Sequence, residues 1–139
     1  MSKAVAFTIY GEPASKANSR RAVMLPKKGG GKRAGFIKSE KALDYADAAE
    51  KQIPSYAMVM FDAPVRVVMK IYYSTQRPDL DESLILDLLQ AKIFIDKPTK
   101  KRFIEKKGVY LNDRLVREKH IYHGIDKQNP RAEILVEPI

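Results

Sequence analysis

The chain has 139 residues, no cysteine, and 26 Lys and Arg residues against 17 Asp and Glu residues, a formal net charge of +9. Its length suits one domain with a real hydrophobic core, and its composition indicates a soluble globular protein rather than a disordered one. The absence of cysteine excludes a disulfide scaffold, a cysteine zinc site and a thiol nucleophile. The excess positive charge favours a polyanionic partner. We expect neither a signal peptide nor a membrane partner.

The first part of the chain predicts a strand, a long loop and a helix. Residues 4–10 are apolar and β-prone, which predicts the first strand. Residues 11–35 hold five of the seven glycines and many Lys and Arg residues, which predicts a basic, flexible loop, with a short strand at 23–25 left open. Ser39 is a plausible N-cap for an Ala-rich helix that Pro54 ends.

The remaining elements complete a predicted α/β fold. Residues 65–73 alternate like a core strand, and residues 79–94 carry leucines on one helical face. The basic stretch 97–108 follows as an insertion. Further strands are predicted at 109–111, 114–123 and 131–137. The order predicts a single domain over residues 1–139, with a mixed β-sheet and about two helices packed on one face.

Three aspartates stand where predicted strands end. Asp79 and Asp81 lie at a strand-to-helix junction, and Asp113 follows Asn112 after a later strand. In an extended segment Asp79 and Asp81 point to the same side, because side chains alternate with period two. Carboxylate oxygens suit Mg²⁺ or Mn²⁺. In a strongly basic chain this pattern predicts metal-dependent phosphodiester hydrolysis, in which basic residues hold the backbone and acids hold the cation.

Each carboxylate also has a purely structural interpretation. Asp79 can be an N-cap, with Glu82 completing a capping box, and Asp113 can belong to a plain turn. Asp96 is an alternative third acid. Asp81 is the most informative, because it heads the apolar face of the predicted helix, where an unpaired charge is costly.

The residues RPDLD before a Leu-rich helix, a short strand ending in ND followed by RLV, and a late NPRAEILV strand resemble the RusA-type Holliday junction resolvases. The resemblance covers most of the chain, including the basic segment after GEP. It implies a homodimer of α/β subunits that binds four-way DNA junctions and cuts two opposing strands symmetrically with a divalent metal. It also implies a phage or prophage protein that acts in recombination and repair in the cytoplasm of a bacterial host.

The resemblance also assigns the site. It implies Mg²⁺, with Mn²⁺ as the alternative, no small-molecule cofactor, and catalytic metal ligands at Asp79, Asp81 and Asp113. Two positions depart from the family pattern. Glu82 stands where the family usually has Asn, and Ile85 stands where it has a functional Lys. Lys100 or Lys101, from the basic insertion, is a candidate replacement for that cation.

Two basic tracts flank these acids in chain order, and we expect them to grip DNA phosphates without reading sequence. The candidate DNA-binding residues are Lys16, Arg20, Arg21, Lys27, Lys28, Lys32, Arg33, Lys100 and Lys101. The tracts can also be ordinary solvated surface. Two other functions stay open, namely a catalytically weak or inactive branched-DNA-binding protein of the same fold, and a basic structural protein of nucleoprotein particles.

Overall fold

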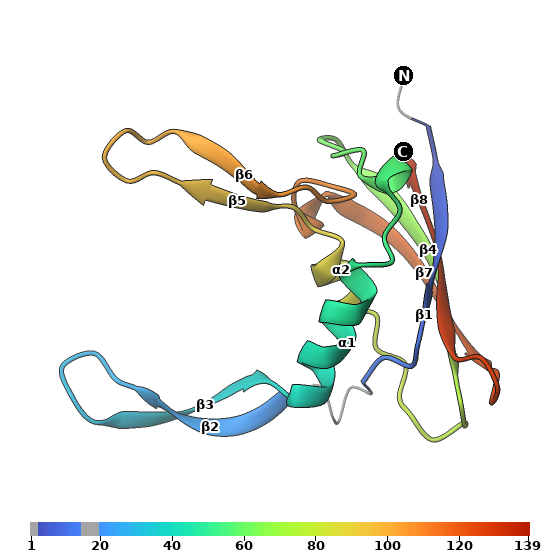
Figure 1. Cartoon of the computed structure of the whole chain (residues 1–139), viewed down its shortest axis with the longest axis horizontal. Coiled ribbons are helices and arrows are strands. Elements are labelled where there is room, and N and C mark those ends of the chain that lie inside the picture. The colour runs from blue at the N-terminus through green and yellow to red at the C-terminus, as the bar shows by residue number, and fades with distance from the viewer. Residues whose placement is uncertain (1–2, 15–19) are drawn as a thin grey trace.

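The computed structural model describes residues 3–14 and 20–139 (Figure 1). Its centre is a four-stranded sheet in the order β1-β8-β4-β7. The strands are β1 (Val5–Tyr10), β4 (Val65–Tyr73), β7 (Val116–Ile125) and β8 (Arg131–Pro138). β8 pairs antiparallel with both β1 and β4, whereas β4 and β7 are parallel. The prediction of an α/β fold with a mixed sheet is confirmed.

The core lies on one face of this sheet. β4 alternates buried and more exposed side chains, and Val67, Met69 and Ile71 are fully buried. β8 adds Ile134 and Val136 to the same core. Such alternation follows from the period of two in a strand with one face covered. The predicted strands at 4–10, 65–73 and 131–137 are therefore confirmed, each to within a residue or so.

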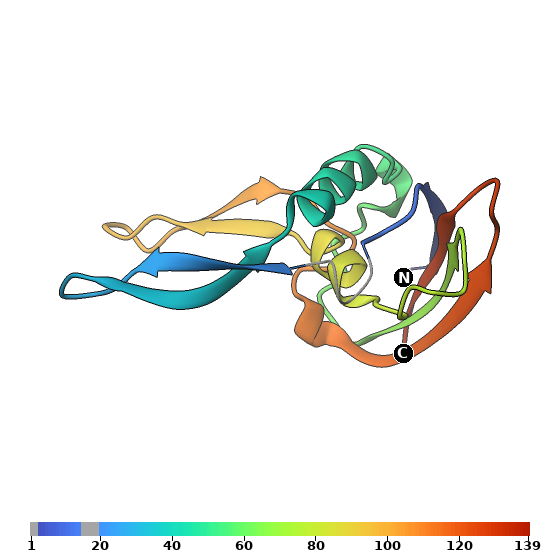
Figure 2. The same cartoon turned by 90° about the horizontal axis from the view of Figure 1, so that it is seen from below.

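Two helices cover that face, as expected (Figures 1 and 2). α1 (Glu40–Glu50) begins after Ser39, whose hydroxyl accepts a hydrogen bond from the Ala42 amide at 3.1 Å. α2 (Ser83–Leu88) is short and packs Leu84, Ile85 and Leu88 into the core. A 3₁₀ turn, η2 (Ser55–Ala57), follows α1. No helix in the described part of the chain combines the length and the apolar character needed to cross a membrane.

The prediction that residues 11–35 form one flexible loop is wrong. β2 (Arg20–Pro26) and β3 (Lys32–Lys38) pair in register as an antiparallel hairpin. Its turn contains three successive glycines, 29–31, with φ between +78° and +102°, where other residues are strained. The glycines that indicated a loop therefore mark only the turn. The basic composition of the flanking strands masked their pairing.

The predicted helix over 79–94 is too long at both ends. Helix α2 spans only Ser83–Leu88, and β5 (Lys92–Ile95) begins four residues later. The Leu89 carbonyl accepts a hydrogen bond from the Val109 amide at 2.8 Å, so the chain leaves the helix there. β-Branched and aromatic residues at 93–95 favour a strand. Leucine spacing alone did not reveal either boundary.

The predicted basic insertion at 97–108 is the second half of another hairpin. β5 pairs antiparallel with β6 (Arg102–Lys106). Asp96 lies in its turn, where its side chain accepts a hydrogen bond from Thr99, so it does not act as a third acid beside Asp81. The predicted strand at 109–111 is reduced to bridges from Tyr110 to Phe61 and Gln90. A 3₁₀ turn, η3 (Asp113–Leu115), precedes β7.

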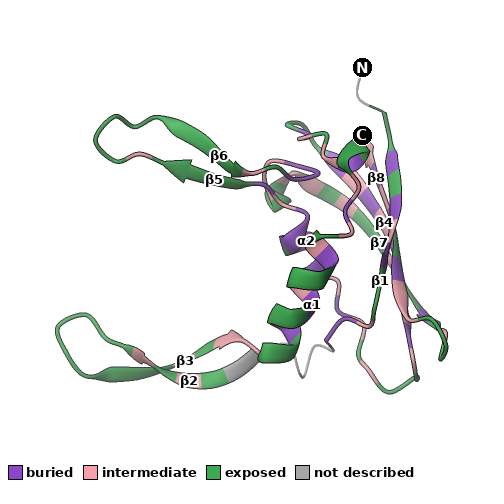
Figure 3. Cartoon of the chain, in the orientation of Figure 1, coloured by how far each residue is buried: buried purple, intermediate pink, exposed green. Residues whose placement is uncertain are grey.

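Both hairpins project from the domain on the same side, beyond the helices (Figures 1 and 2). Figure 3 shows them almost entirely exposed, in contrast to the buried sheet and helix faces. An isolated two-stranded hairpin is marginally stable in water. Each one is tied at its base by an ion pair to a helix, Lys38 to Asp87 at 2.6 Å and Lys106 to Glu50 at 2.7 Å.

Candidate functional site

Asp81 is the only buried charged residue in the described part of the chain, with 6% of its surface exposed. Its Oδ1 accepts hydrogen bonds from the Ser83 amide at 3.1 Å and the Ser83 hydroxyl at 2.6 Å. Its own amide donates to the Tyr73 hydroxyl at 3.3 Å. Asp81 therefore closes an Asx turn at the start of α2. The carboxylate that we expect at the start of the apolar helix face therefore has specific hydrogen-bond donors.

Asp79 lies two residues earlier and is exposed. Its carbonyl accepts a hydrogen bond from the Tyr73 hydroxyl at 3.3 Å, so this tyrosine of β4 fixes the segment from 79 to 81. Burial raises the pKa of Tyr73, and the negative charge of Asp81 raises it further. The capping box from Asp79 to Glu82 does not form, because Glu82 itself precedes the first helical residue.

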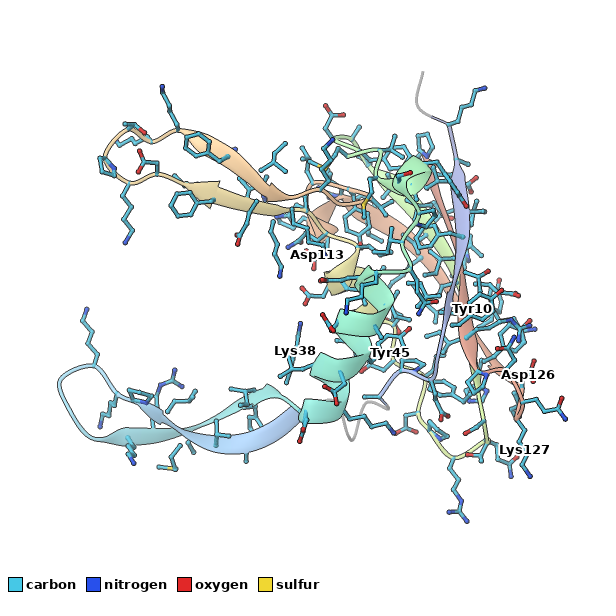
Figure 4. All side chains as sticks on the ribbon, in the orientation of Figure 1. Tyr10, Lys38, Tyr45, Asp113, Asp126 and Lys127 are labelled. Atoms are coloured by element: carbon cyan, nitrogen blue, oxygen red, sulfur yellow. The ribbon has the colours of Figure 1, made fainter. Side chains whose placement is uncertain are left out.

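Asp113 is brought beside α2 by η3. Its amide donates to the Gln90 side-chain oxygen at 2.8 Å, and Asn112 caps the turn by accepting from the Arg114 amide at 2.9 Å. Asp113 and Ser83 line the same hollow, of about 370 Å³. Figure 4 shows Asp113 at the base of the β5–β6 hairpin, on the side from which both hairpins project.

The same hollow holds a cation that sequence reasoning missed. Lys119 of β7 lines it and forms an ion pair with Glu82 at 2.9 Å. Ile85, at the position of the family's lysine, is fully buried. Lys100 and Lys101 lie in the β5–β6 turn and do not border this hollow, so neither replaces that lysine. No sequence signal links Lys119 to Glu82, because parallel strand pairing brings them together across 37 residues.

Polar residues in and just after α2 contact both Asp113 and the β2–β3 hairpin. Asp87 pairs with Lys38 of β3, while Gln90, just after the helix, binds the Asp113 amide. A second hollow, of about 270 Å³, lies where the two hairpins begin, lined by Lys38, Asp87, Gln90 and Lys92 among others. Asp113 therefore lies near the residues that border the bases of both hairpins.

The donor chemistry suits a hard cation, but a complete set of ligands is not assembled. Among the described residues, no three Asp, Glu or His side chains come together in a group that could hold a metal ion. Mg²⁺ usually takes one or two carboxylates and completes its shell with water and substrate phosphates. The exposed carboxylates of Asp79 and Asp113 suit that mode, whereas no three-carboxylate cage is present among the described residues.

Most predicted DNA-binding residues lie on the hairpins. Arg20 and Arg21 belong to β2. Six further candidates have exposed side chains, namely Lys27, Lys28, Lys32, Arg33, Lys100 and Lys101. Lys16 lies outside the described residues. Segments 20–38 and 92–106 together hold 13 of the 26 basic residues and 2 of the 17 acidic ones, leaving 13 basic against 15 acidic elsewhere. The net positive charge of the chain is therefore entirely on the two hairpins.

No protein-family model matches this chain, and no curated protein matches it either. The resemblance to RusA-type resolvases rests on the sequence motifs alone.

Proposed function

We propose that this protein is a metal-dependent endonuclease of the RusA type that resolves four-way DNA junctions by paired, symmetric strand cleavage. The observation that carries the proposal is the position of Asp113 and of the Asp81–Ser83 turn. Asp113 and Ser83, the hydrogen-bond partner of Asp81, line one hollow, and Asp113 lies at the base of a strongly basic hairpin. Acids gathered within a basic surface suit a metal-assisted attack on a phosphodiester.

The chain's own residues would position the reacting phosphate. The hairpins attract the DNA backbone, and Asp113 at the base of the β5–β6 hairpin offers a carboxylate to a cation held with that backbone. Asp81 is locked by Ser83, whereas Asp79 and Asp113 are exposed and free to approach a cation held with DNA. Such a cation, Mg²⁺ or Mn²⁺, supplies a water of lowered pKa and offsets charge on the phosphate. Lys119 adds a positive charge at the hollow.

The proposal includes the assembly and setting that the resemblance implies. A homodimer would match the two-fold symmetry of a four-way junction and direct two sites to opposed strands. The protein would act in recombination and repair, encoded by a phage or prophage and working in the cytoplasm of a bacterial host. Neither a small-molecule cofactor nor a membrane takes part in this reaction.

The test is cleavage of a synthetic four-way junction with Mg²⁺, with the cut positions mapped on all strands. Asp79→Asn, Asp81→Asn and Asp113→Asn should each abolish paired nicks while junction binding persists. Asp44→Asn is the matched control, because Asp44 is an exposed aspartate on the outer side of α1. Full cleavage by the Asp113 variant would refute the site, and cleavage of linear duplex at an equal rate would refute the substrate.

The second candidate is a junction-binding protein that cuts weakly or not at all. It is favoured by Ile85, an apolar, fully buried residue at the position of the family's lysine. This function predicts tight, salt-sensitive junction binding with no Mg²⁺-dependent product in the wild type. The same gels therefore distinguish the two functions.

A further inference from the structure

Both hairpins carry exposed apolar side chains. On β5, Lys92 and Phe94 share a face, because alternate residues of a strand point to the same side. On β3, Phe36 and Lys38 share a face for the same reason. Lys92 and Lys38 line one hollow between the hairpin bases, so at the bases these two faces border the same space.

The aromatic side chains on these faces are unusually exposed to solvent. Phe94 and Phe103 are cross-strand partners with ring centroids 6.5 Å apart, and they are 55% and 51% exposed. Phe36 is 72% exposed, and Met24 lies on the same face of the β2–β3 hairpin. The opposite face of the β5–β6 hairpin is turned toward the domain, since Ile93 borders a hollow with Leu111 and Leu115. Further along, Ile95 and Ile104 of that opposite face are 51% and 57% exposed, so the aromatic rings are what distinguishes the phenylalanine face.

The charge around these rings indicates which kind of partner binds there. The two hairpins carry 13 basic and 2 acidic residues, so a second copy would bring a like-charged pair of hairpins into the same space. A polyanion is attracted there instead. Phenylalanine rings among Lys and Arg are suited to unpaired bases, which stack on aromatic side chains while the backbone meets the cations. A continuous duplex hides its base faces within its own stack.

We propose that the β2–β3 and β5–β6 hairpins form a site for single-stranded, unpaired DNA. Phe36, Phe94 and Phe103 provide the stacking surfaces, and the surrounding Lys and Arg residues hold the phosphates. The inference rests on the proposed function only for the choice of DNA as the polymer. It requires no cleavage. It adds that the protein engages the opened strands of a branched substrate as well as its duplex arms.

Acidic residues at the helices set where the strand runs. Asp87 and Glu50, at the hairpin bases, are each paired with a hairpin lysine, and Asp47 pairs with Lys51 of α1. Each pair is neutral, so these acids offset the charge of the lysines that they hold at the base. The strand therefore crosses the outer parts of the hairpins, where the only acids near Lys27, Lys28, Lys100 and Lys101 in sequence are Asp96 and Glu105.

The experiment compares the binding of a labelled oligothymidylate of roughly 16 nucleotides with that of a duplex of the same length. Fluorescence anisotropy is measured at one salt concentration in EDTA, so that cleavage has no influence. Phe94→Ala with Phe103→Ala, and Phe36→Ala separately, should weaken single-strand binding by roughly 10-fold or more while changing duplex binding far less. Tyr122→Ala is the matched control, because Tyr122 is an exposed aromatic of β7 away from the hairpins.

Three outcomes would overturn the inference. They are unchanged single-strand affinity in the phenylalanine variants, an equal loss for single strand and duplex, or a change of oligomeric state in light scattering with DNA affinity intact. The last would identify the face as a contact between copies. Circular dichroism of each variant confirms that the domain is folded. Failure of junction cleavage with single-strand binding intact would refute the proposed enzyme but leave this site standing.

Discussion

The ammonium of Lys119 on β7 lies 2.9 Å from the carboxylate of Glu82, the residue before α2. This pair joins the parallel strand edge to the start of the helix that follows Asp79 and Asp81. Lys119 also borders the hollow lined by Asp113 and Ser83. Lys119 and Arg117, which lines the same hollow, are the cations placed to face a phosphate bound there, since Ile85 is buried and apolar.

Replacing Lys119 with alanine should slow junction cleavage by roughly 10- to 100-fold, because a positive charge facing the reacting phosphate is lost. The free energy of unfolding should fall by less than about 1 kcal/mol, since the lysine side chain of this ion pair is half exposed. Single-turnover cleavage and urea denaturation provide the two measurements. Lys127→Ala is the control, because Lys127 lies at the far end of the sheet (Figure 4). Equal rates in both variants would remove Lys119 from the site.

The hydrogen bonds from Ser83 to Asp81 should contribute measurably to folding. Asp81→Ala removes the acceptor at the start of α2 and should lower the free energy of unfolding by about 1–2 kcal/mol. Asp81→Asn keeps an acceptor oxygen and should lose less. Asp79→Ala, at an exposed position, should stay within about 0.5 kcal/mol. Urea denaturation followed by circular dichroism ranks the three variants, and a reversed order would contradict the turn described here.

Gly108 is required where the β5–β6 hairpin returns to the domain. A Cβ at this position would lie 2.3 Å from the Ala91 backbone nitrogen, which cannot move aside like a flexible side chain. Gly108→Ala should therefore cost at least about 2 kcal/mol of stability. Gly29→Ala is the comparison, because it meets open space and suffers only from its φ of +90°, at about 1 kcal/mol. Similar losses for both variants, measured by thermal unfolding, would argue against this close approach.

Tyr45 of α1 carries a buried hydroxyl that has no hydrogen-bond partner among the described residues. Burial raises its pKa above the ordinary value of 10.0. The unfolded chain therefore releases this proton first, and stability should fall as the pH rises above that value. Tyr45→Phe removes the unpaired hydroxyl, so it should raise the free energy of unfolding by about 1 kcal/mol and flatten the alkaline decline. Denaturation at several alkaline pH values checks both effects, and a destabilised phenylalanine variant would contradict them.

The sheet strands and α1 were predictable because their signals are local. Residues 65–73 alternate strongly, and Ser39 begins α1 with a side-chain cap. The β2–β3 hairpin escaped prediction because both of its faces are largely exposed, so its sequence has little alternation to display. The early end of α2 depends on the Val109 amide taking the Leu89 carbonyl, a contact from a distant part of the chain.

The candidate site likewise has one part that the sequence predicted and another that it did not. The position of Asp81 on the apolar face correctly indicated a buried, partnered carboxylate, because burial of an unpaired charge is costly. The approach of Asp113 to α2 depends on Gln90, and that of Lys119 on the parallel pairing of β4 with β7. These are tertiary relationships with no periodic trace in the sequence. The shared faces of Phe94 with Phe103 and of Phe36 with Met24 follow from strand register, which also required the structure.

The most direct test of the central claim is Mg²⁺-dependent cleavage of a four-way junction by the wild type and by Asp113→Asn, with binding measured on the same samples. The account predicts paired nicks from the wild type, none from the variant, and junction affinity that is equal within about threefold. Undiminished cleavage by Asp113→Asn would contradict it.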